Sequence, residues 1–392
     1  MAKIKHEPLF HLTKRTDISA KKAWAIRIVA FVLAILLSAV VTSILSGKDF
    51  SFFFKHFFTG AFGTERNIWN LLHEAAILLM IALAVTPCFK MRFWNIGGEG
   101  QILMGCLGSA VIIQFMGGTS SNGLTIFVSL ILAVAFGIVW AVIPALFKAK
   151  WNTNETLLTL MMNYIATYVV AYFIKAVALK GSGILVFNDG TIDGLFGNEF
   201  LLKILVCLVV TTIMAIYLKY TKQGYEIAVV GESENTARYI GINTKKVIIR
   251  TLIICGAICG IIGFLLVSAT NHGLESTAVK GRGFTGVLIS WLGHFNPLAM
   301  ALCSFIYALA TRGAVQVGTV ARLGDSYPNI IVAILFLCIL ATEFFINYNL
   351  VFKYSYKIKA FFAPLTDKLA KINLKLPTKK AKVVVKEEKE GE

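Results

Sequence analysis

The sequence predicts an all-α polytopic membrane protein with about ten transmembrane helices, and three observations predict it. Of the 392 residues, 57% are hydrophobic and only 15% are charged, whereas soluble globular chains carry about 25% charged residues. The apolar residues gather in segments of about 20 residues, the length at which a helix crosses a bilayer. The net charge of +17 is concentrated in the two flanks of the chain. That placement is typical of termini beside anionic cytoplasmic lipid, and it argues against a nucleic-acid partner.

The expected spans follow from windows of about 20 apolar residues. They lie near residues 25–45, 70–89, 99–116, 124–147, 157–179, 200–218, 251–270, 284–294, 297–311 and 328–348. An even number of spans places both termini on one side. Lys148 and Lys150 follow the fourth span, and the 219–250 loop is rich in Lys and Arg. The positive-inside rule therefore assigns these loops and both termini to the cytoplasm.

This pattern divides the chain into three regions, and a long loop lies inside the second. We expect a basic cytoplasmic segment at 1–24, a transmembrane domain at 25–348 with the 219–250 loop inside it, and a basic tail at 349–392 that is partly disordered. The first apolar run is long enough to span and lacks a small-residue cleavage motif after it, so we expect no cleaved signal. The aromatic stretch Phe50–Phe62 fits an outer membrane interface, and residues 180–199 fit an outer loop.

Two of the apolar segments are broken by glycines and polar residues, near 90–101 and near 271–297. The second break leaves a piece of about 11 residues, which rises about 16 Å, or half the hydrocarbon core. Irregular backbone at membrane depth is tolerated only where it is buried in protein or lines a water-filled cavity. Broken helices in corresponding halves of a chain point to a mid-membrane site and to a possible inverted repeat.

The first break, Asn95 to Gln101, supplies the candidate pathway residues. Carboxylates and amides in hydrocarbon are costly unless water, protein or cargo solvates them. We expect the solute pathway to be lined by these side chains and one from the fifth span: Asn95, Gly98, Glu99, Gln101 and Asn163.

Structural interpretations compete with each assignment. The whole stretch can be a short cytoplasmic loop. Glu99 and Asn95 can cap a helix start, Gly98 can permit close packing, and Asn163 can bind a neighbouring helix rather than a hydroxyl-rich solute. At the outer end of the second span, His73 and Glu74 are explained by solvation. The remaining charged or titratable candidates, interpreted as loop residues at helix breaks, are His272, Arg282 and His294.

The 219–243 part of the long loop predicts a short amphipathic helix that docks in a groove on a partner. Its apolar anchors are expected to be Tyr225, Ile227, Val230, Tyr239 and Ile242. The alternative is an ordinary basic loop that is held by anionic lipid.

Three sequence blocks carry a resemblance to a known family. The first is Phe93-Trp94-Asn95-Ile96-Gly97-Gly98-Glu99-Gly100-Gln101, the second runs from Asn154 to Tyr164, and the third from Thr221 to Ile242. Over residues 70–345 the chain resembles the membrane permease subunits of ABC importers for simple sugars, nucleosides and related solutes, and it is similar to branched-chain amino-acid permeases. Trp94 is inserted relative to the first family motif. In the third block the family's arginine is Ala228 and its Asn-Pro pair is Ser233-Glu234.

The resemblance implies a multi-pass permease of a bacterial plasma membrane that pairs with a second, homologous permease. It implies an ABC ATPase subunit inside and a solute-binding protein or lipoprotein outside, with no cofactor. The second block favours nucleosides, with simple sugars or riboflavin-like solutes next. The residues that it assigns to coupling with the ATPase are Gly224, Tyr225, Gly231, Ala237, Tyr239, Gly241 and Ile242.

Two other classes of function remain as alternatives. An ion-gradient-driven secondary transporter would use Glu99 as its titrating group. An intramembrane enzyme is disfavoured because no catalytic or metal-ligating constellation is visible. The chain contains no Gly-x-x-x-x-Gly-Lys-[Ser/Thr] phosphate loop, so ATP hydrolysis is expected in a partner subunit.

Overall fold

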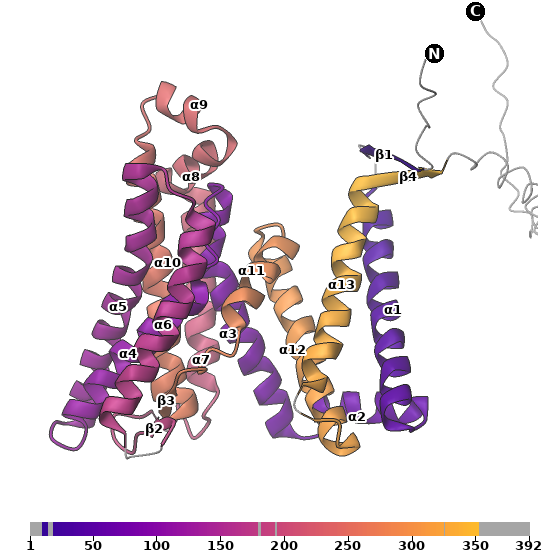
Figure 1. The fold of residues 1–392 in the computed structure, drawn as a ribbon, viewed down its shortest axis with the longest axis horizontal. Helices are drawn as coiled ribbons and strands as arrows, with labels where there is room; N and C mark the ends of the chain where they lie inside the picture. The colour runs from indigo at the N-terminus through magenta and orange to yellow at the C-terminus, as the bar shows by residue number, and fades with distance from the viewer. Residues whose placement is uncertain (1–9, 15–18, 179–181, 193, 325, 353–392) are drawn as a thin grey trace, which may run out of the picture. The chain divides into compact units, whose positions relative to one another are not determined.

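The computed structural model describes residues 10–14, 19–178, 182–192, 194–324 and 326–352. The chain forms two compact units, residues 36–335 and residues 1–35 with 336–392. The elements, labelled in Figure 1, are β1 (Phe10–Lys14), α1 (Ala20–Ser46), α2 (Phe50–Phe62), α3 (Glu65–Lys90), α4 (Gly98–Met116), α5 (Asn122–Trp151), α6 (Glu155–Val177), β2 (Ile184–Val186), α7 (Leu201–Tyr220), α8 (Lys222–Glu232), α9 (Glu234–Tyr239), α10 (Thr244–Leu266), the π-helical turn η1 (Val267–Asn271), β3 (Gly273–Glu275), α11 (Arg282–Leu292), α12 (Pro297–Ala321), α13 (Tyr327–Asn347) and β4 (Tyr348–Phe352).

The predicted class, an all-α polytopic membrane protein, is confirmed. Among the described residues, nine helices are long and apolar enough to cross a membrane. The tenth expected span is the half-length helix α11 (Arg282–Leu292), which follows the break at 271–281. The half-length piece that the second break predicted is therefore confirmed. The inverted repeat stays a prediction.

The 219–250 loop is shorter than predicted. Helix α10 begins at Thr244, because the Asn243 side chain accepts a hydrogen bond from the Lys246 amide at 3.1 Å and caps the helix start. The loop proper therefore ends near residue 243, and it consists mostly of the short helices α8 and α9. The expected tail lies outside the described residues from 353 onward, and the N-terminal segment is described only at 10–14 and 19–24.

The aromatic stretch at Phe50–Phe62 forms helix α2, whose Phe53 and Phe57 are buried. Helix α2 packs on α12, while its Phe50, Phe58 and Phe62 remain exposed. Its placement at the outer interface stays a prediction. Residues 184–186 of the expected 180–199 loop pair antiparallel with β3, and Leu185 lies opposite Leu274. This small sheet fixes the loop against the second broken segment.

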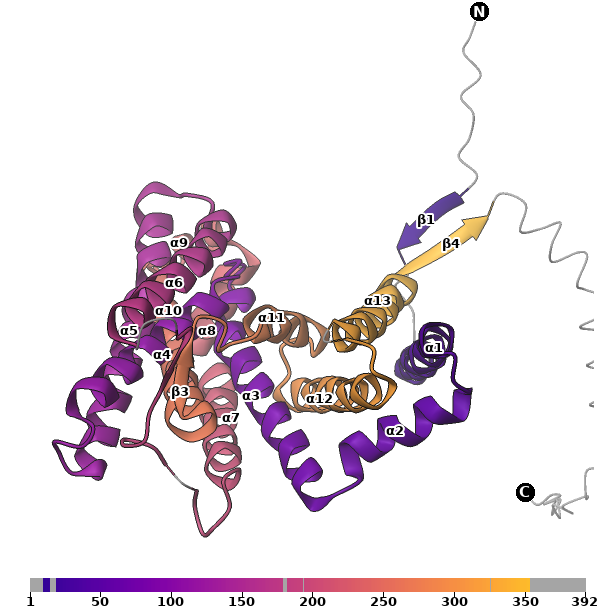
Figure 2. The ribbon, with the colours of Figure 1, turned by 60° about the horizontal axis from the view of Figure 1, so that its bottom comes forward.

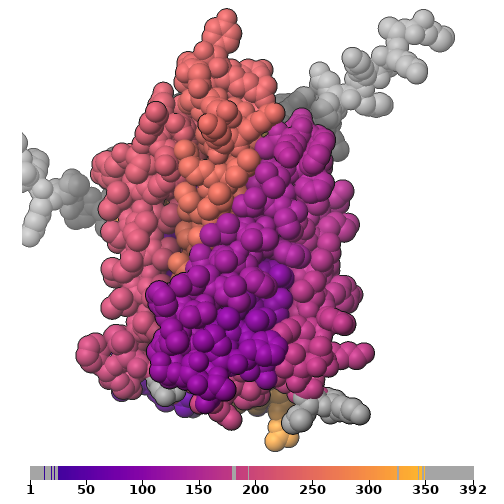
Figure 3. Space-filling view, turned by 90° about the vertical axis from the view of Figure 1, so that its left-hand side faces the viewer, coloured from indigo at the N-terminus to yellow at the C-terminus, as the bar shows by residue number. Residues whose placement is uncertain are grey.

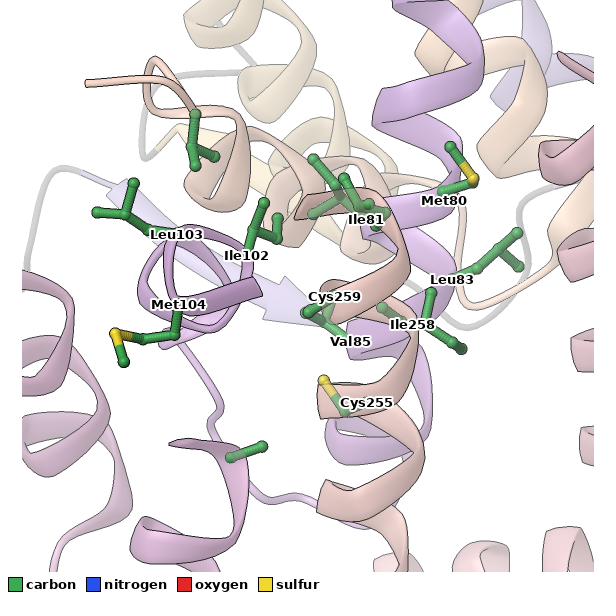
Figure 4. Close-up of a cluster of buried hydrophobic side chains, with 14 of the residues drawn as sticks. Met80, Ile81, Leu83, Val85, Ile102, Leu103, Met104, Cys255, Ile258 and Cys259 are labelled. Atoms are coloured by element: carbon green, nitrogen blue, oxygen red, sulfur yellow. The ribbon is translucent and has the colours of Figure 1, made fainter. Parts of the chain in front are cut away.

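The core of the larger unit lies between helices α3, α4 and α10. Figure 4 shows their buried side chains together, among them Met80 and Ile81 of α3, Ile102 and Leu103 of α4, and Ile258 of α10. Helix α10 lies equally close to α5 because small residues face each other there. A Cβ atom added to Gly260 would lie 2.5 Å from the Ala133 carbonyl oxygen. Such small-residue contacts let membrane helices approach closely and gain van der Waals packing.

This packing predicts the effect of adding one methyl group. We expect Gly260→Ala to lower the free energy of unfolding by about 1–3 kcal/mol, the usual cost of overpacking a core. Thermal unfolding of the detergent-solubilised protein measures it. Gly123→Ala is the matched control, since a Cβ at Gly123 meets no atom within 4 Å. Equal unfolding temperatures for the two variants would contradict the α5–α10 packing.

Candidate functional site

The first broken segment is a tight turn held by buried amides. The Asn95 Oδ1 accepts hydrogen bonds from the Gly97 amide at 3.0 Å and from the Gln101 Nε2 at 3.2 Å. Both side chains also bind the Cys255 thiol of α10, each at 3.3 Å. Asn95 and Gln101 are almost completely buried. Their polar atoms therefore form hydrogen bonds that hold the turn before α4 in place, which is a structural role.

Helix α6 clamps the same segment through Asn163. The Asn163 Oδ1 accepts from the Gly100 amide at 2.8 Å, and its Nδ2 donates to the Ile96 carbonyl at 3.0 Å. The Thr159 hydroxyl accepts from the Ile96 amide at 3.3 Å. These contacts agree with the interpretation in which Asn163 binds a neighbouring segment of the chain, because both ends of its side-chain amide bind backbone groups.

Glu99 reaches across to the second broken segment. Its Oε1 accepts from the Gly281 amide at 2.8 Å, and its Oε2 accepts from the Gly283 amide at 2.7 Å. These amides belong to the start of α11, where free N–H groups and the positive end of the helix dipole favour a carboxylate. The capping interpretation placed Glu99 at the start of its own helix α4, whereas the helix that it caps is α11.

Position 283 accepts only glycine because α4 and α11 touch there. A Cβ atom built on Gly283 would contact the Glu99 amide nitrogen and lie 2.6 Å from the Glu99 Cα. Gly98 is also close, with Gly283 backbone atoms 3.9 Å from an added Cβ. The glycines of the two broken segments therefore let the two helix starts meet.

A second carboxylate, Glu74 of α3, holds the same helix start from the other side. The Arg282 guanidinium donates to both Glu74 oxygens, at 2.8 and 2.9 Å, and Arg312 of α12 lies 3.8 Å from Glu74. Glu74 and His73 are both buried. The expectation that solvation explains them is wrong. Glu74 is satisfied by an ion pair, and Arg282 belongs to α11 rather than to a loop.

Lys203 of α7 places a positive charge at the end of α10, on the other side of the second broken segment. Its Nζ donates to the Ala269 carbonyl at 2.8 Å, within the π-helical turn η1 that ends α10. A cation is favourable at a helix C-terminus. Lys203 is absent from the predicted site residues, although a lysine inside an apolar span is an available signal in the sequence. His272, which follows η1, has a left-handed backbone (φ 46°), and so does His294 after α11 (φ 48°).

The loop after α7 folds into two capped short helices. The Thr221 and Ser233 hydroxyls accept hydrogen bonds from the amides of Gly224 and Thr236. Ile227 and Val230 are buried, so their expected role as anchors for a partner is wrong. The hydrophobic face of α8 covers this chain's own helices instead.

The loop rests on the end of α3. A Cβ atom built on Gly231 would overlap the Lys90 carbonyl oxygen. The Arg250 guanidinium of α10 also binds the Glu226 carboxylate of α8 at 2.9 Å. The loop is thus packed on the ends of α3 and α10, and it protrudes at the top of Figure 3.

The predicted coupling residues divide into two groups. Gly224 and Ala237 are buried, Gly241 adopts a φ of 84°, and Ile242 donates its amide to the Ala237 carbonyl at 2.9 Å. These residues shape the loop. Tyr225 and Tyr239 are exposed, the latter to 95%, and Ile240 beside Tyr239 is exposed too. This second group offers the large exposed apolar side chains of the loop.

A cavity of about 700 Å³ opens beside the loop. It lies between the end of α5 and the start of α10, and its lining includes the basic side chains Lys148, Lys150, Arg238 and Lys245. Within the described residues, no group of three or more His, Cys, Asp or Glu side chains is arranged to hold a metal ion.

Comparison with known proteins gives the family. Residues 67–340 match the model of the permease component of branched-chain amino acid transport systems. The chain is 25% identical to the guanosine ABC transporter permease protein NupP of Bacillus subtilis (strain 168), over 79% of this chain and 91% of the relative. It is 24% identical to the nucleoside ABC transporter permease protein NupB of Lactococcus lactis subsp. cremoris (strain MG1363), over 73% and 82% of the two chains.

A third relative has a different solute in its name. The chain is 26% identical to the glucose ABC transporter permease protein TsgB13 of Haloferax volcanii, over 73% of this chain and 79% of the relative. All three relatives are named as ABC transporter permease proteins, and their names carry different solutes.

The Glu74–Arg282 pair predicts a strong energetic coupling between α3 and α11. Glu74→Gln or Arg282→Gln alone leaves one buried charge without its main partner, so each costs about 3–5 kcal/mol of unfolding free energy. The double variant should cost about 1–3 kcal/mol less than the sum of the two. Chemical unfolding in detergent measures the cycle. The exposed Arg238–Glu234 pair of α9 is the control, with a coupling below about 1 kcal/mol; equal couplings would contradict the buried pair.

Proposed function

This chain belongs to the permease component family of branched-chain amino acid transport systems, and we propose that the solute it carries is a nucleoside. It is an ABC importer permease, a multi-pass membrane subunit without catalytic activity of its own. Two relatives named for guanosine or nucleoside transport, together with the Asn154–Tyr164 block, support a nucleoside. A simple sugar, as in the name of the Haloferax volcanii relative, or a riboflavin-like solute is the alternative.

An ABC permease works with an ATPase and a binding protein, and we propose the arrangement of these partners. The ATPase docks on the loop of α8 and α9, and the binding protein docks at the opposite end of the bundle. A second, homologous permease completes the pathway. Both termini lie on the cytoplasmic side of a bacterial plasma membrane, as the positive-inside pattern predicts.

One observation carries the coupling proposal: the loop touches the start of the broken segment. Gly231 of α8 rests on the Lys90 carbonyl, directly before the turn at Phe93–Gly97. That turn leads into Glu99, and Glu99 holds α11. A displacement of α8 by the ATPase is therefore passed to the half-length helix through the backbone contact of Gly231 with Lys90 and the two hydrogen bonds that the Glu99 carboxylate accepts from α11. Interfaces packed this closely switch between discrete arrangements rather than deform gradually.

In this proposal the pathway runs beside α11 and the turn at 95–101. Gly98 and Glu99 lie at the meeting point of the two broken segments, while Asn95, Gln101 and Asn163 keep the turn in shape. Glu99 is a positioning residue, because both of its oxygens are occupied by α11 amides. This use of Glu99 disfavours the ion-driven alternative, in which the carboxylate would titrate.

Energy coupling tests the proposed function. Uptake of radiolabelled guanosine should vanish when the phosphate-binding lysine of the partner ATPase is replaced, and it should survive an uncoupler that collapses the proton gradient while ATP is maintained. Uptake that survives the ATPase exchange and collapses with the uncoupler would establish the ion-driven alternative. Uptake of glucose or riboflavin in place of guanosine would change the proposed solute but leave the class of transporter, an ABC importer, unchanged.

The exposed tyrosines of the loop predict a separation of coupling from folding. Tyr225→Ala with Tyr239→Ala removes the accessible aromatic side chains without touching the buried face of the loop. We expect loss of ATPase co-purification and a fall in uptake of at least about tenfold, the effect of about 1.4 kcal/mol of lost docking energy. The unfolding temperature should not change.

The control is Phe115→Ala, which removes an exposed aromatic side chain near the C-terminal end of α4. This variant should still co-purify with the ATPase and take up solute normally. A double tyrosine variant that still binds the ATPase and transports normally would remove the loop from the coupling interface.

A further inference from the structure

The cavity beside the loop of α8 and α9 holds more positive charge than nearby carboxylates balance. Four basic side chains and one carboxylate line it: Lys148, Lys150, Arg238, Lys245 and Glu234. The Arg238 guanidinium is paired with Glu234. The Lys148 Nζ lies 2.9 Å from a carboxylate oxygen of Glu155 at the start of α6. Two of the four cations are therefore compensated within the chain, and two are left over.

The two remaining cations are Lys150 at the end of α5 and Lys245 at the start of α10. Both side chains are exposed, and within the described part of the chain neither forms an ion pair with a carboxylate. The Lys150 Nζ lies 5.8 Å from the centroid of the Trp151 ring, a contact that leaves its charge in place. The cavity also lies at the N-terminal end of α10, where the helix dipole favours an anion. Its ligand is therefore expected to be anionic.

The cavity lies at the depth of the membrane interface. Helix α5 has 30 residues, so it rises about 45 Å, which is more than the hydrocarbon core of about 30 Å. Its last turn, which lines the cavity, therefore reaches the lipid headgroups. The exposed rings of Phe147 and Trp151 lie there, 5.1 Å apart between centroids, and aromatic rings are favoured at this depth. Both ribbon views show α9 beside this end of α5 (Figures 1 and 2).

An apolar strip leads away from the cavity along α5. Leu146 precedes Lys150 by four residues, and Val139 precedes Leu146 by seven, so the three side chains share one side of the helix. Val139 and Leu146 are both exposed, and they lie in a candidate membrane span. A basic cavity at headgroup depth that continues into an exposed apolar strip matches the two parts of an anionic phospholipid. A water-soluble anion would use only the basic part.

We propose that this cavity binds the phosphate of an anionic phospholipid headgroup, while the acyl chains lie along α5. The positive-inside pattern assigns this end of the bundle to the cytoplasmic side, where anionic lipid is abundant and attracts Lys and Arg. Because Arg238 belongs to α9 and Lys245 to α10, the bound headgroup contacts the loop and the bundle together. The lipid thus fastens the loop of α8 and α9 to the bundle, at a site separate from the solute pathway proposed above.

Binding of short-chain lipids to the detergent-purified full chain tests the site. Dihexanoyl phosphatidylglycerol, which is anionic, should bind more tightly than dihexanoyl phosphatidylcholine, which has no net charge. The affinity for phosphatidylglycerol should fall about thirtyfold in Lys150→Gln with Lys245→Gln, because two attractive charges are lost. Lys150→Arg with Lys245→Arg keeps both charges and should keep the affinity. The matched control, Lys219→Gln with Lys222→Gln, removes two exposed lysines outside the cavity at the same end of the bundle, and it should bind phosphatidylglycerol normally.

Each contrary result assigns the cavity differently. Equal affinities for the two lipids, or an equal loss of affinity in the glutamine variant and in the control, would leave no specific lipid site. If inorganic phosphate displaces phosphatidylglycerol at the same concentration at which the lipid binds, the cavity belongs to a soluble phosphate and the inference is overturned. Phosphatidylglycerol should also stay bound in the assembled transporter. Its release when the partner ATPase binds would overturn the inference and assign the cavity to an acidic surface of the ATPase.

Discussion

The carboxylate of Glu99 joins the two broken segments of this permease, and the arrangement of the candidate site depends on it. At that point two helices begin inside the bundle, and the start of a helix leaves backbone N–H groups without partners. In a membrane no water replaces them. Glu99 supplies two charge-assisted bonds to the start of α11, and its own position is fixed because Asn95, Gln101 and Asn163 hold the turn before α4.

Charged side chains stabilise both helix ends at the break between α10 and α11. The break exposes a helix C-terminus, where Lys203 binds the Ala269 carbonyl, and a helix N-terminus, where Glu99 binds two amides. Each charge has the sign that the helix dipole favours. Arg282, which begins α11, is compensated by Glu74. A half-length helix at membrane depth is therefore held at its first residues by bonds, while its far end packs through Trp291 on Trp94. Helix α11 also packs along α3, where the Ser290 and Thr86 hydroxyls lie 2.9 Å apart.

Much of this could be predicted from local spacing, and the remainder depends on contacts that are distant in sequence. The spans, both breaks, the short helix at 282–292 and a capping carboxylate follow from apolar periodicity and from the chemistry of glycine and helix ends. The partner of Glu99 does not, since Gly281 lies 182 residues away. The Glu74–Arg282 pair spans 208 residues, and without it a buried Glu74 cannot be told from a solvated one. Ile227 and Val230 fit an amphipathic pattern equally well on either surface, and only the packing of α8 decides which surface they cover.

Replacing Glu99 tests the central claim most directly. Glu99→Gln keeps the shape of the side chain, but it lacks the charge and turns an NH2 group toward one of the two α11 amides. If Glu99 is a structural clamp, unfolding free energy should fall by about 1–3 kcal/mol, uptake should fall in proportion to the folded fraction, and the pH dependence of uptake should not change. A fully stable Glu99→Gln protein whose uptake is abolished, or shifted in its pH profile, would contradict the account and make Glu99 a titrating group of the transport cycle.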